Sequence, residues 1–197
     1  MGSSKAIRLK LIMMEGLEVL KYLEQLHPFS NSFRAALLDG LIEERYRKNE
    51  VIYGPSHAET RVWFVASGYL FRYQVYHSIK IVDLYKENTF IMCCPFGKTN
   101  SDFIQVLADC RLWTVPNRKL KNLRETERDG AIVERLVLMQ ELLRREKSIA
   151  MVRSPLEQRV QLFLDEFPEI FRVAPLQIIC SYLNMSRESL RRLRNKR

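Results

Sequence analysis

The chain of 197 residues is long enough for one medium domain or two small ones, each with a core of its own. Hydrophobic residues make up 47% and charged residues 28% of the chain, which excludes global disorder, and no apolar run reaches the roughly 20 residues of a membrane-spanning helix. The net charge of +9 and the pI near 9.5 indicate an acidic partner, and they favour nucleic acid over a membrane.

The N-terminus does not have the pattern of a signal peptide, because Lys10 interrupts its apolar patch and no small-residue cleavage site follows. The four cysteines have no Cys-x-x-Cys spacing, so we expect reduced thiols, mostly in the core. Both features predict a cytoplasmic protein. The cysteines are Cys93, Cys94, Cys110 and Cys180.

The first predicted elements are short helices between residues 15 and 45, with a break at His27-Pro28. From about Tyr46 the period changes, and residues 51–53 read as a short strand that Gly54-Pro55 ends. Residues 62–66 and 69–75 are predicted to be two strands joined by a glycine turn at Ser67-Gly68. Residues 79–85 and 103–115 continue the alternation, which predicts a small barrel or jelly roll rather than a parallel sheet.

A long helical stretch follows over residues 117–152, with a predicted break near Asp129-Gly130. Beyond the glycine, apolar residues recur in a seven-residue rhythm and form a wide stripe. Such a stripe needs a partner, which is either the β-domain itself or the same helix of a second subunit. The stripe comprises Ile132, Leu136, Met139, Leu143 and Ala150, widened by Leu138, Leu142 and Ile149.

The next helix is predicted to start at residues 154–157, where Ser154 would cap, Pro155 would take the first helical position and Glu157 would close a capping box. This start makes Arg153-Ser154 the expected hinge between two units. A core face of Leu156, Val160, Phe163, Leu164 and Phe167 is expected before Pro168 ends the helix.

The last twenty-three residues predict two short helices with a tight corner. Pro175 suits the first turn of the first helix, and Asn184 tolerates the left-handed conformation that a tight corner demands. Ser186 is a favoured N-cap for a second helix that runs from Arg187 to the end. On that helix Leu190 and Leu193 share one face, and the opposite face carries Glu188, Arg191, Arg192 and Asn195.

The second of these helices is strongly basic. Between Arg187 and Arg197 there are six basic residues and one acidic residue, a net +5 out of the +9 of the chain. An apolar seam with a guanidinium-rich outer face suits a phosphate-lined groove, where arginine can bind guanine edges and glutamate can accept from cytosine. The alternative is a solvated amphipathic helix.

The order of residues at 186–193, SRESLRRL, resembles the recognition helix of the Crp/Fnr regulators, whose pattern is Ser-Arg-Glu-Thr/Ser-Val/Leu-any-Arg-Ile/Leu. The resemblance implies that Arg187, Glu188 and Arg192 read bases, and that Ser186 and Ser189 make phosphate or capping contacts. We add Arg191, on the exposed face, and Lys196, as a phosphate contact, to the DNA-binding candidates.

Two further stretches resemble the cyclic-nucleotide-binding domains of the same family. Residues 63–69, WFVASGY, are similar to their aliphatic-x-x-Gly-aliphatic turn, and residues 104–110, IQVLADC, are similar to the strand after their phosphate-binding cassette. The resemblance implies an α+β fold: an N-terminal antiparallel β-roll or jelly roll over 1–127, a long dimerisation helix over 128–152, and an all-α helix-turn-helix domain over 153–197.

The nucleotide pocket of that family needs a Gly-Glu pair for the ribose and an arginine for the phosphate. Residues 87–101 contain neither, and Lys98 could supply a charge but not a bidentate fork. Bulky Phe90, Ile91, Met92 and Phe96 predict an apolar or filled pocket. We therefore expect no response to cyclic AMP.

The sequence gives little support for a metal or haem site or for catalysis. No cysteine precedes Cys93, and His27, His57 and His77 form no telling constellation, so neither an iron–sulfur cluster, haem nor a metal is expected. The chain has no catalytic motif, and an enzyme built on a jelly roll would need metal ligands inside it. Relatives often continue after the recognition helix into a β-wing that contacts the DNA backbone, and we expect the excess arginine in residues 187–197 to compensate for such contacts.

These observations predict a cytoplasmic, homodimeric transcription regulator without a cofactor. Its partners would be a palindromic double-stranded DNA operator, a second copy of the chain, and, as further candidates, RNA polymerase and an unidentified small-molecule effector, but no membrane. The alternative is a β-roll module that senses a small molecule or protein and whose basic tail binds anionic surfaces non-specifically.

Overall fold

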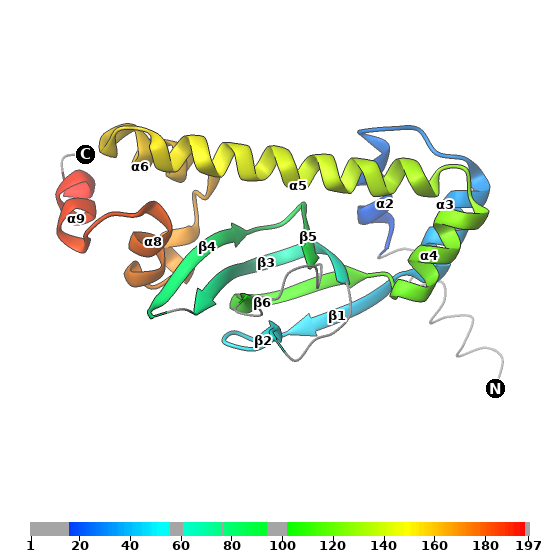
Figure 1. The fold of residues 1–197 in the computed structure, drawn as a ribbon, viewed down its shortest axis with the longest axis horizontal. Coiled ribbons are helices and arrows are strands. Elements are labelled where there is room, and N and C mark those ends of the chain that lie inside the picture. Colours follow the sequence, from blue (N-terminus) through cyan, green and yellow to red (C-terminus); the bar gives the residue numbers. More distant parts are fainter. Residues whose placement is uncertain (1–15, 56–60, 76, 94–101, 196–197) are drawn as a thin grey trace.

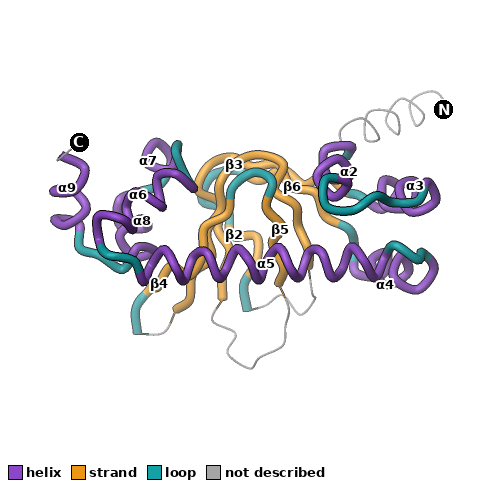
Figure 2. Tube along the Cα trace, turned by 90° about the horizontal axis from the view of Figure 1, so that it is seen from above, coloured by secondary structure: helices purple, strands orange, loops and turns teal. Residues whose placement is uncertain are grey.

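The computed structural model describes residues 16–55, 61–75, 77–93 and 102–195. An antiparallel β-roll occupies the middle of the molecule, and helix α5 runs the length of the molecule above it (Figure 1). Helices α2, α3 and α4 lie at one end of α5 and helices α6 to α9 at the other, as the view from above also shows (Figure 2). Among these residues no helix combines the length and apolar character needed to cross a membrane.

Two short helices, α2 (Leu17–Glu24) and α3 (Asn31–Gly40), precede the roll as predicted. Their buried apolar residues pack with Phe64 and Trp113 of the sheet in one hydrophobic cluster. Ser30 caps α3, because its hydroxyl oxygen accepts from the backbone N–H of Phe33 at 3.4 Å. The same hydroxyl donates to the Asp129 carboxylate at 2.7 Å, which ties α3 to the start of α5.

All strand pairs of the roll are antiparallel, which confirms the predicted kind of sheet. The sheet order is β1-β6-β3-β4, with β2 also paired to β6 and β5 also paired to β3. The strands are β1 (Ile42–Tyr46), β2 (Val51–Tyr53), β3 (Arg61–Val75), β4 (Ile79–Tyr85), β5 (Thr89–Cys93) and β6 (Asp102–Thr114).

The predicted glycine turn at Ser67-Gly68 is wrong, because β3 continues through it as one strand. Gly68 has φ +97°, and the pairing register of β3 with β6 shifts on both sides of it, so the glycine forms a bulge. The bulge bends the strand. The first part of β3 pairs with β5 and the later part with β4, while β6 follows nearly its whole length.

The helical prediction for residues 15–45 is wrong at its end, where strand β1 forms, and strand β5 forms where no element was predicted. Strand β1 carries the charged pair Glu43-Glu44, and the Glu44 carboxylate accepts from the hydroxyl of Tyr46 and the indole N–H of Trp63, both at 2.8 Å. Strand β5 buries Phe90 and Ile91 in two different hydrophobic clusters.

The predicted break before the long helix is confirmed, since α4 (Asn117–Thr126) ends before α5 (Gly130–Arg153) begins. A side chain at Gly130 would place its Cβ 2.3 Å from the carbonyl oxygen of Leu123, so the two helices approach too closely there for any other residue.

The C-terminal unit comprises α6 (Leu156–Glu166), α7 (Ile170–Val173), α8 (Leu176–Leu183) and α9 (Arg187–Asn195). The predicted Ser154 cap of α6 is wrong: this hydroxyl donates to the carbonyl of Ala150 at 2.9 Å and so closes the end of α5. Leu156, expected in the core, is 39% exposed, because α6 begins only at this residue. Val160, Phe163 and Phe167 are buried as predicted.

The C-terminal unit and the roll share one hydrophobic cluster. Phe71, Ile81 and Leu84 of the roll belong to it together with Phe163 and Ile179 of the helices. Helices α5 and α6 begin close to the expected limits at 128 and 153, and the division of the chain into domains at those limits stays a prediction.

Replacing Gly68 with alanine should destabilise the roll. The new Cβ would lie 2.5 Å from both the Asp109 carbonyl oxygen and the Cys110 Cβ, at a φ that side chains rarely adopt. We expect a loss on the order of 1–3 kcal/mol or more in urea unfolding. Gly40→Ala is the control, since its Cβ would make only ordinary contacts of 3.4 and 3.5 Å. Equal stability of both variants would contradict the bulge.

Candidate nucleic-acid interface

The corner between α8 and α9 is built by the backbone of Asn184. This residue ends α8 in the left-handed conformation, with φ 49° and ψ 55°, as the sequence predicted. Its N–H donates to the carbonyl of Ser181 at 3.3 Å, and the N–H of Met185 donates to that of Cys180 at 3.0 Å. These two bonds form a Schellman motif, which fixes the direction in which the chain leaves α8.

Ser186 caps the N-terminus of α9. Its hydroxyl oxygen accepts from the backbone N–H of Ser189 at 3.0 Å, and its hydroxyl donates to the Ser189 hydroxyl oxygen at 2.9 Å. Of the two contacts expected for these serines, the structure forms the capping one.

Two buried leucines hold α9 on the C-terminal unit. Leu190 is 1% exposed and Leu193 is 9% exposed, and both belong to the cluster that contains Phe163 and Leu183. The guanidinium of Arg194 lies 4.8 Å from the ring centre of Phe171, which adds a second attachment. The apolar seam of α9 therefore faces inward, as the helical wheel predicted.

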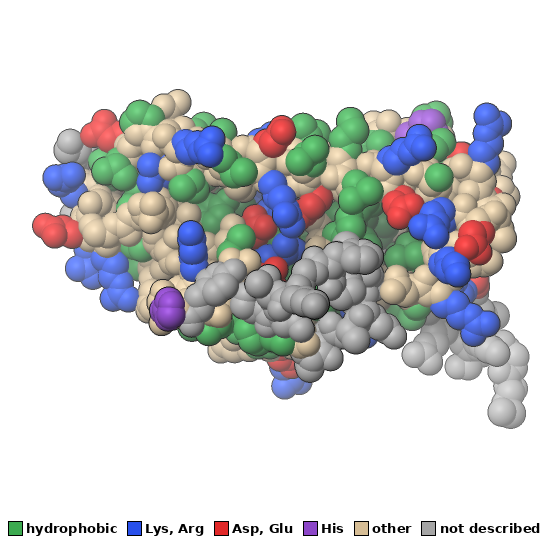
Figure 3. Space-filling model, in the orientation of Figure 1, with side chains coloured by type: hydrophobic (Ala, Val, Ile, Leu, Met, Phe, Trp, Pro, Cys, Tyr) green, Lys and Arg blue, Asp and Glu red, His purple; other side chains and the backbone are tan. Residues whose placement is uncertain are grey.

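The opposite side of α9 is exposed and mainly positive, and it carries Arg187, Glu188, Arg191 and Arg192. Arg187 donates to the side-chain oxygen of Gln177 at 3.2 Å. Among the described residues, the side chains of Glu188, Arg191 and Arg192 make no ion pair and no hydrogen bond. Lysine and arginine side chains gather at this end of the molecule (Figure 3). Lys196 and the side chain of Asn195 lie outside the described residues.

Arg159 supports the corner and was not identified from the sequence. Its Nη1 donates to the carbonyl of Leu183 at 2.8 Å, and its Nη2 donates to that of Ser154 at 2.9 Å. The side chain thereby joins the hinge to the end of α8. The sequence does not mark Arg159 as a supporting residue, because an arginine inside α6 is expected to lie on the solvated face of the helix.

Helix α5 presents a second exposed surface that is apolar. Of the predicted stripe, Ile132 and Leu136 pack against the cluster that contains Phe64, so this part of the stripe covers the roll. The remainder faces outward: Leu138, Met139, Leu142, Leu143 and Ile149 are between 43% and 57% exposed. We call these five residues the α5 apolar face.

The expected ligand pocket of the roll falls partly outside the described residues, which omit Phe96, Lys98 and Ser101. In its described part, Phe90 and Ile91 are buried and Met92 is half-buried. Among the described residues no group of three or more histidine, cysteine or acidic side chains could hold a metal. Cys93, Cys110 and Cys180 are buried, and burial, together with Asp109 and Glu50, raises the pKa of Cys110 to about 12.

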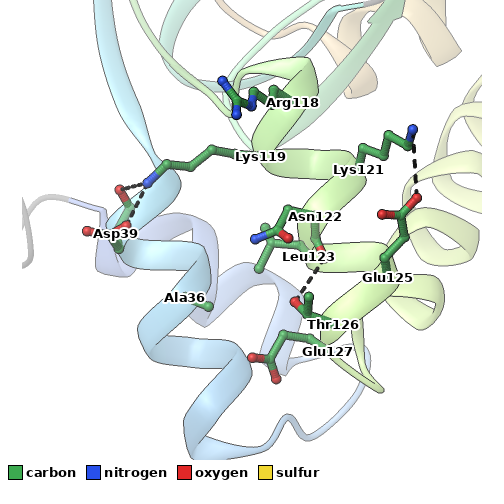
Figure 4. Close-up of a pocket in the computed structure, with 10 residues that line it drawn as sticks. All are labelled: Ala36, Asp39, Arg118, Lys119, Lys121, Asn122, Leu123, Glu125, Thr126 and Glu127. Atoms are coloured by element: carbon green, nitrogen blue, oxygen red, sulfur yellow. Dashed lines mark hydrogen bonds and ion pairs between the residues drawn. The ribbon is translucent and has the colours of Figure 1, made fainter.

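A surface pocket of about 770 Å³ lies between α3 and α4 (Figure 4). Its charged lining residues are largely paired with one another, Lys119 with Asp39 at 2.6 Å and Lys121 with Glu125 at 3.9 Å. Because these charges compensate each other, the pocket has no strong preference for an anion or a cation, and we assign no function to it.

Comparison with known proteins gives structural likenesses only, since no family model and no curated protein matches the chain. FixK2 from Bradyrhizobium japonicum is 20% identical, with a TM-score of 0.65 over 79% of this chain and 83% of that one. A protein from Eubacterium rectale assigned to the Crp/Fnr transcriptional regulators is 18% identical, with a TM-score of 0.65 over 88% and 85%.

The c-di-GMP-responsive global regulator CLP from Xanthomonas campestris is 14% identical, with a TM-score of 0.60 over 85% of this chain and 91% of that one. Each of these likenesses covers about four fifths of the chain or more. The chain therefore has the α+β fold of the Crp/Fnr regulators, a β-roll followed by a long helix and a C-terminal helical domain.

Proposed function

We propose that this protein is a sequence-specific DNA-binding transcription regulator of the Crp/Fnr type that acts in the cytoplasm as a homodimer. The observation that carries the proposal is the exposed, positive face of α9, fixed by the corner at Asn184 and by the buried Leu190. The fold likeness to proteins named as regulators supports it. The proposal includes no catalytic residue and no cofactor.

The first turns of α9 would enter the major groove. Arginine forks match the two acceptors of guanine, and a glutamate accepts from the amino group of cytosine, which suits Arg187, Arg192 and Glu188 to base reading. The Ser186 hydroxyl is engaged in the cap, so the N-terminus of the helix would attract a phosphate through its backbone N–H groups and dipole. The phosphate backbone of the DNA would be bound by Ser189, Arg191 and Lys196.

The α5 apolar face would pair with the same face of a second copy. Five large apolar side chains exposed along one helix are a surface that soluble proteins normally cover. Pairing about a two-fold axis along α5 would bring both copies of α9 to the same end of the dimer, since α9 lies beyond the C-terminal end of α5 (Figure 1). RNA polymerase and a small-molecule effector are further candidate partners.

The first test is sequence-specific binding to a palindrome whose half-sites lie about one helical turn, roughly 34 Å, apart. Arg192→Ala should cost on the order of 1–3 kcal/mol per half-site and relax the base preference, because it removes a base contact. Lys196→Ala, the matched control, should weaken all sequences alike.

Glu188→Ala separates this function from the non-specific alternative. Loss of a negative charge should weaken specific binding but not adhesion to anionic surfaces in general. Selection from a random DNA pool, followed by titration at physiological salt, measures both quantities. Equal affinity of the unmodified protein for every duplex would refute the proposal.

The second test concerns the dimer. Met139→Glu would bring two like charges together across the two-fold seam, and we expect monomers that no longer bind the operator tightly. Leu162→Glu is the control, because Leu162 is also exposed, at 38%, but lies on α6. Light scattering at micromolar concentration measures the mass, and a monomeric unmodified protein would show that the α5 apolar face has another role.

The third test is a negative one: cyclic AMP and cyclic GMP should not bind at physiological concentrations. The stretch 87–101 has no Gly-Glu pair for the ribose and no arginine for the phosphate. Loss of two charged hydrogen-bonding contacts, roughly 1.5–3 kcal/mol each, should raise a micromolar dissociation constant toward millimolar. Calorimetric titration decides it, and saturation in the low micromolar range would contradict the expectation.

A further inference from the structure

A cluster of charged side chains lies buried between the roll and α5. Asp83 on β4 is 4% exposed, Glu141 on α5 is 8% exposed and Arg72 on β3 is 6% exposed. Arg144 forks onto Asp83, with Nη1 to Oδ1 at 2.6 Å and Nη2 to Oδ2 at 3.1 Å.

The remaining contacts of the cluster lie within α5 and extend to strands β3, β4 and β5. Glu141 accepts from Arg144 at 3.0 Å and from Arg145 at 3.0 Å, one turn along the same helix. The ring centre of Tyr85 lies 4.6 Å from the Arg144 guanidinium and 5.7 Å from that of Arg72. Arg72 also donates to the carbonyl of Met92 on β5 at 3.0 Å. The cluster therefore connects β3, β4, β5 and α5.

Such a cluster fixes geometry more than it adds stability. Removing ions from water is costly, and only good pairing compensates for the cost. Burial lowers the pKa of Arg144, but its hydrogen bonds and charge interaction with Asp83, together with the Glu141 bond, outweigh burial and hold that pKa above its ordinary value. A shift of α5 along the roll would separate the fork from Asp83 and leave buried charges unpaired.

Helix α5 and strand β4 also hold the C-terminal unit. Ser148, one turn beyond Arg144, makes a hydroxyl contact of 2.9 Å with Tyr182 of α8. The N–H of Ile81, two residues before Asp83, donates to the hydroxyl of Ser181 at 3.1 Å. After β4, Lys86 pairs with Glu166 of α6 at 3.0 Å. The placement of α8, and of α9 beyond it, thus depends on how α5 and β4 lie relative to each other.

We propose that Asp83, Glu141 and Arg144 form an internal lock that holds α5 on the roll and sets the position of α9, so that no bound effector is needed at this contact for DNA binding. The inference rests on the proposed function and specifies its regulation.

The test compares Arg144→Met and the isosteric Asp83→Asn with Arg124→Met. Arg124 also pairs with a residue of α5, Glu134, at 3.7 Å, but both side chains are about half exposed, so it is a matched control for loss of a guanidinium. Circular dichroism identifies a temperature at which all variants are folded. Two quantities are then measured on the full chain: hydrogen exchange of the α5 amides and affinity for the selected operator without any added small molecule.

We expect Arg144→Met to raise exchange in the second half of α5, and to weaken the operator, each on the order of tenfold to a hundredfold. Asp83→Asn should act in the same direction, and the double variant should be little worse than Arg144→Met alone, because both remove one interaction. Arg124→Met should match the unmodified protein. If Arg144→Met does not fold, Asp83→Asn alone decides.

Three results would overturn the lock. Folded variants could melt earlier yet keep unmodified exchange and affinity, which would make the cluster merely structural. Arg124→Met could lose as much as Arg144→Met, which would make the effect one of net charge. A small molecule could copurify with the protein in equimolar amount, and its removal could abolish DNA binding, which would show that an effector is needed. An unmodified protein that binds no specific DNA would instead refute the proposed function, and the exchange measurement would still decide on the lock.

Discussion

The position of the candidate recognition helix depends on one hydrophobic cluster that two parts of the chain build together. Phe71, Ile81 and Leu84 come from the roll, and the C-terminal helices contribute Phe163, Ile179 and Leu183. Burial of apolar area is the main favourable term in such contacts and has no preferred direction, so it brings the parts together without fixing their angle. The polar contacts at the rim, Ser148 with Tyr182 and Ile81 with Ser181, supply the direction.

The C-terminal unit could be predicted well because its signals are local. Asn184 and Ser186 determine the corner through their own backbone and side chain, and the spacing of Leu190 and Leu193 is enough to orient α9. The roll could be predicted only in part. Gly68 allows a tight turn and a bulge equally, and only the pairing of β3 with β6 on both sides of it decides for the bulge. Ser154 is likewise a residue type that could cap α6, but its hydroxyl donates to the carbonyl of Ala150 in the last turn of α5 instead.

The buried charges show where sequence reasoning ends. Glu141, Arg144 and Arg145 stand at spacings typical of a solvated helix face. Arg145 is indeed half exposed, but Glu141 is buried and Arg144 is partly buried where it pairs with Asp83. Asp83 lies 61 residues earlier than Arg144 and carries no local sequence signal of this pairing. An ion pair of this kind can be recognised only once the sheet and the helix are placed against each other. The same holds for Arg159, whose acceptors, the carbonyls of Ser154 and Leu183, carry no sequence information.

Among the described strands, β4 is the last on its side of the sheet, and helix α8 packs against it. Ser181 accepts from the Ile81 N–H there, a group that would otherwise be available to a strand of another molecule. An uncovered edge with apolar neighbours is the template through which separate sheets join and aggregate. The C-terminal unit thus also protects the roll: the fold couples the solubility of the roll to the presence of the helices beyond the hinge.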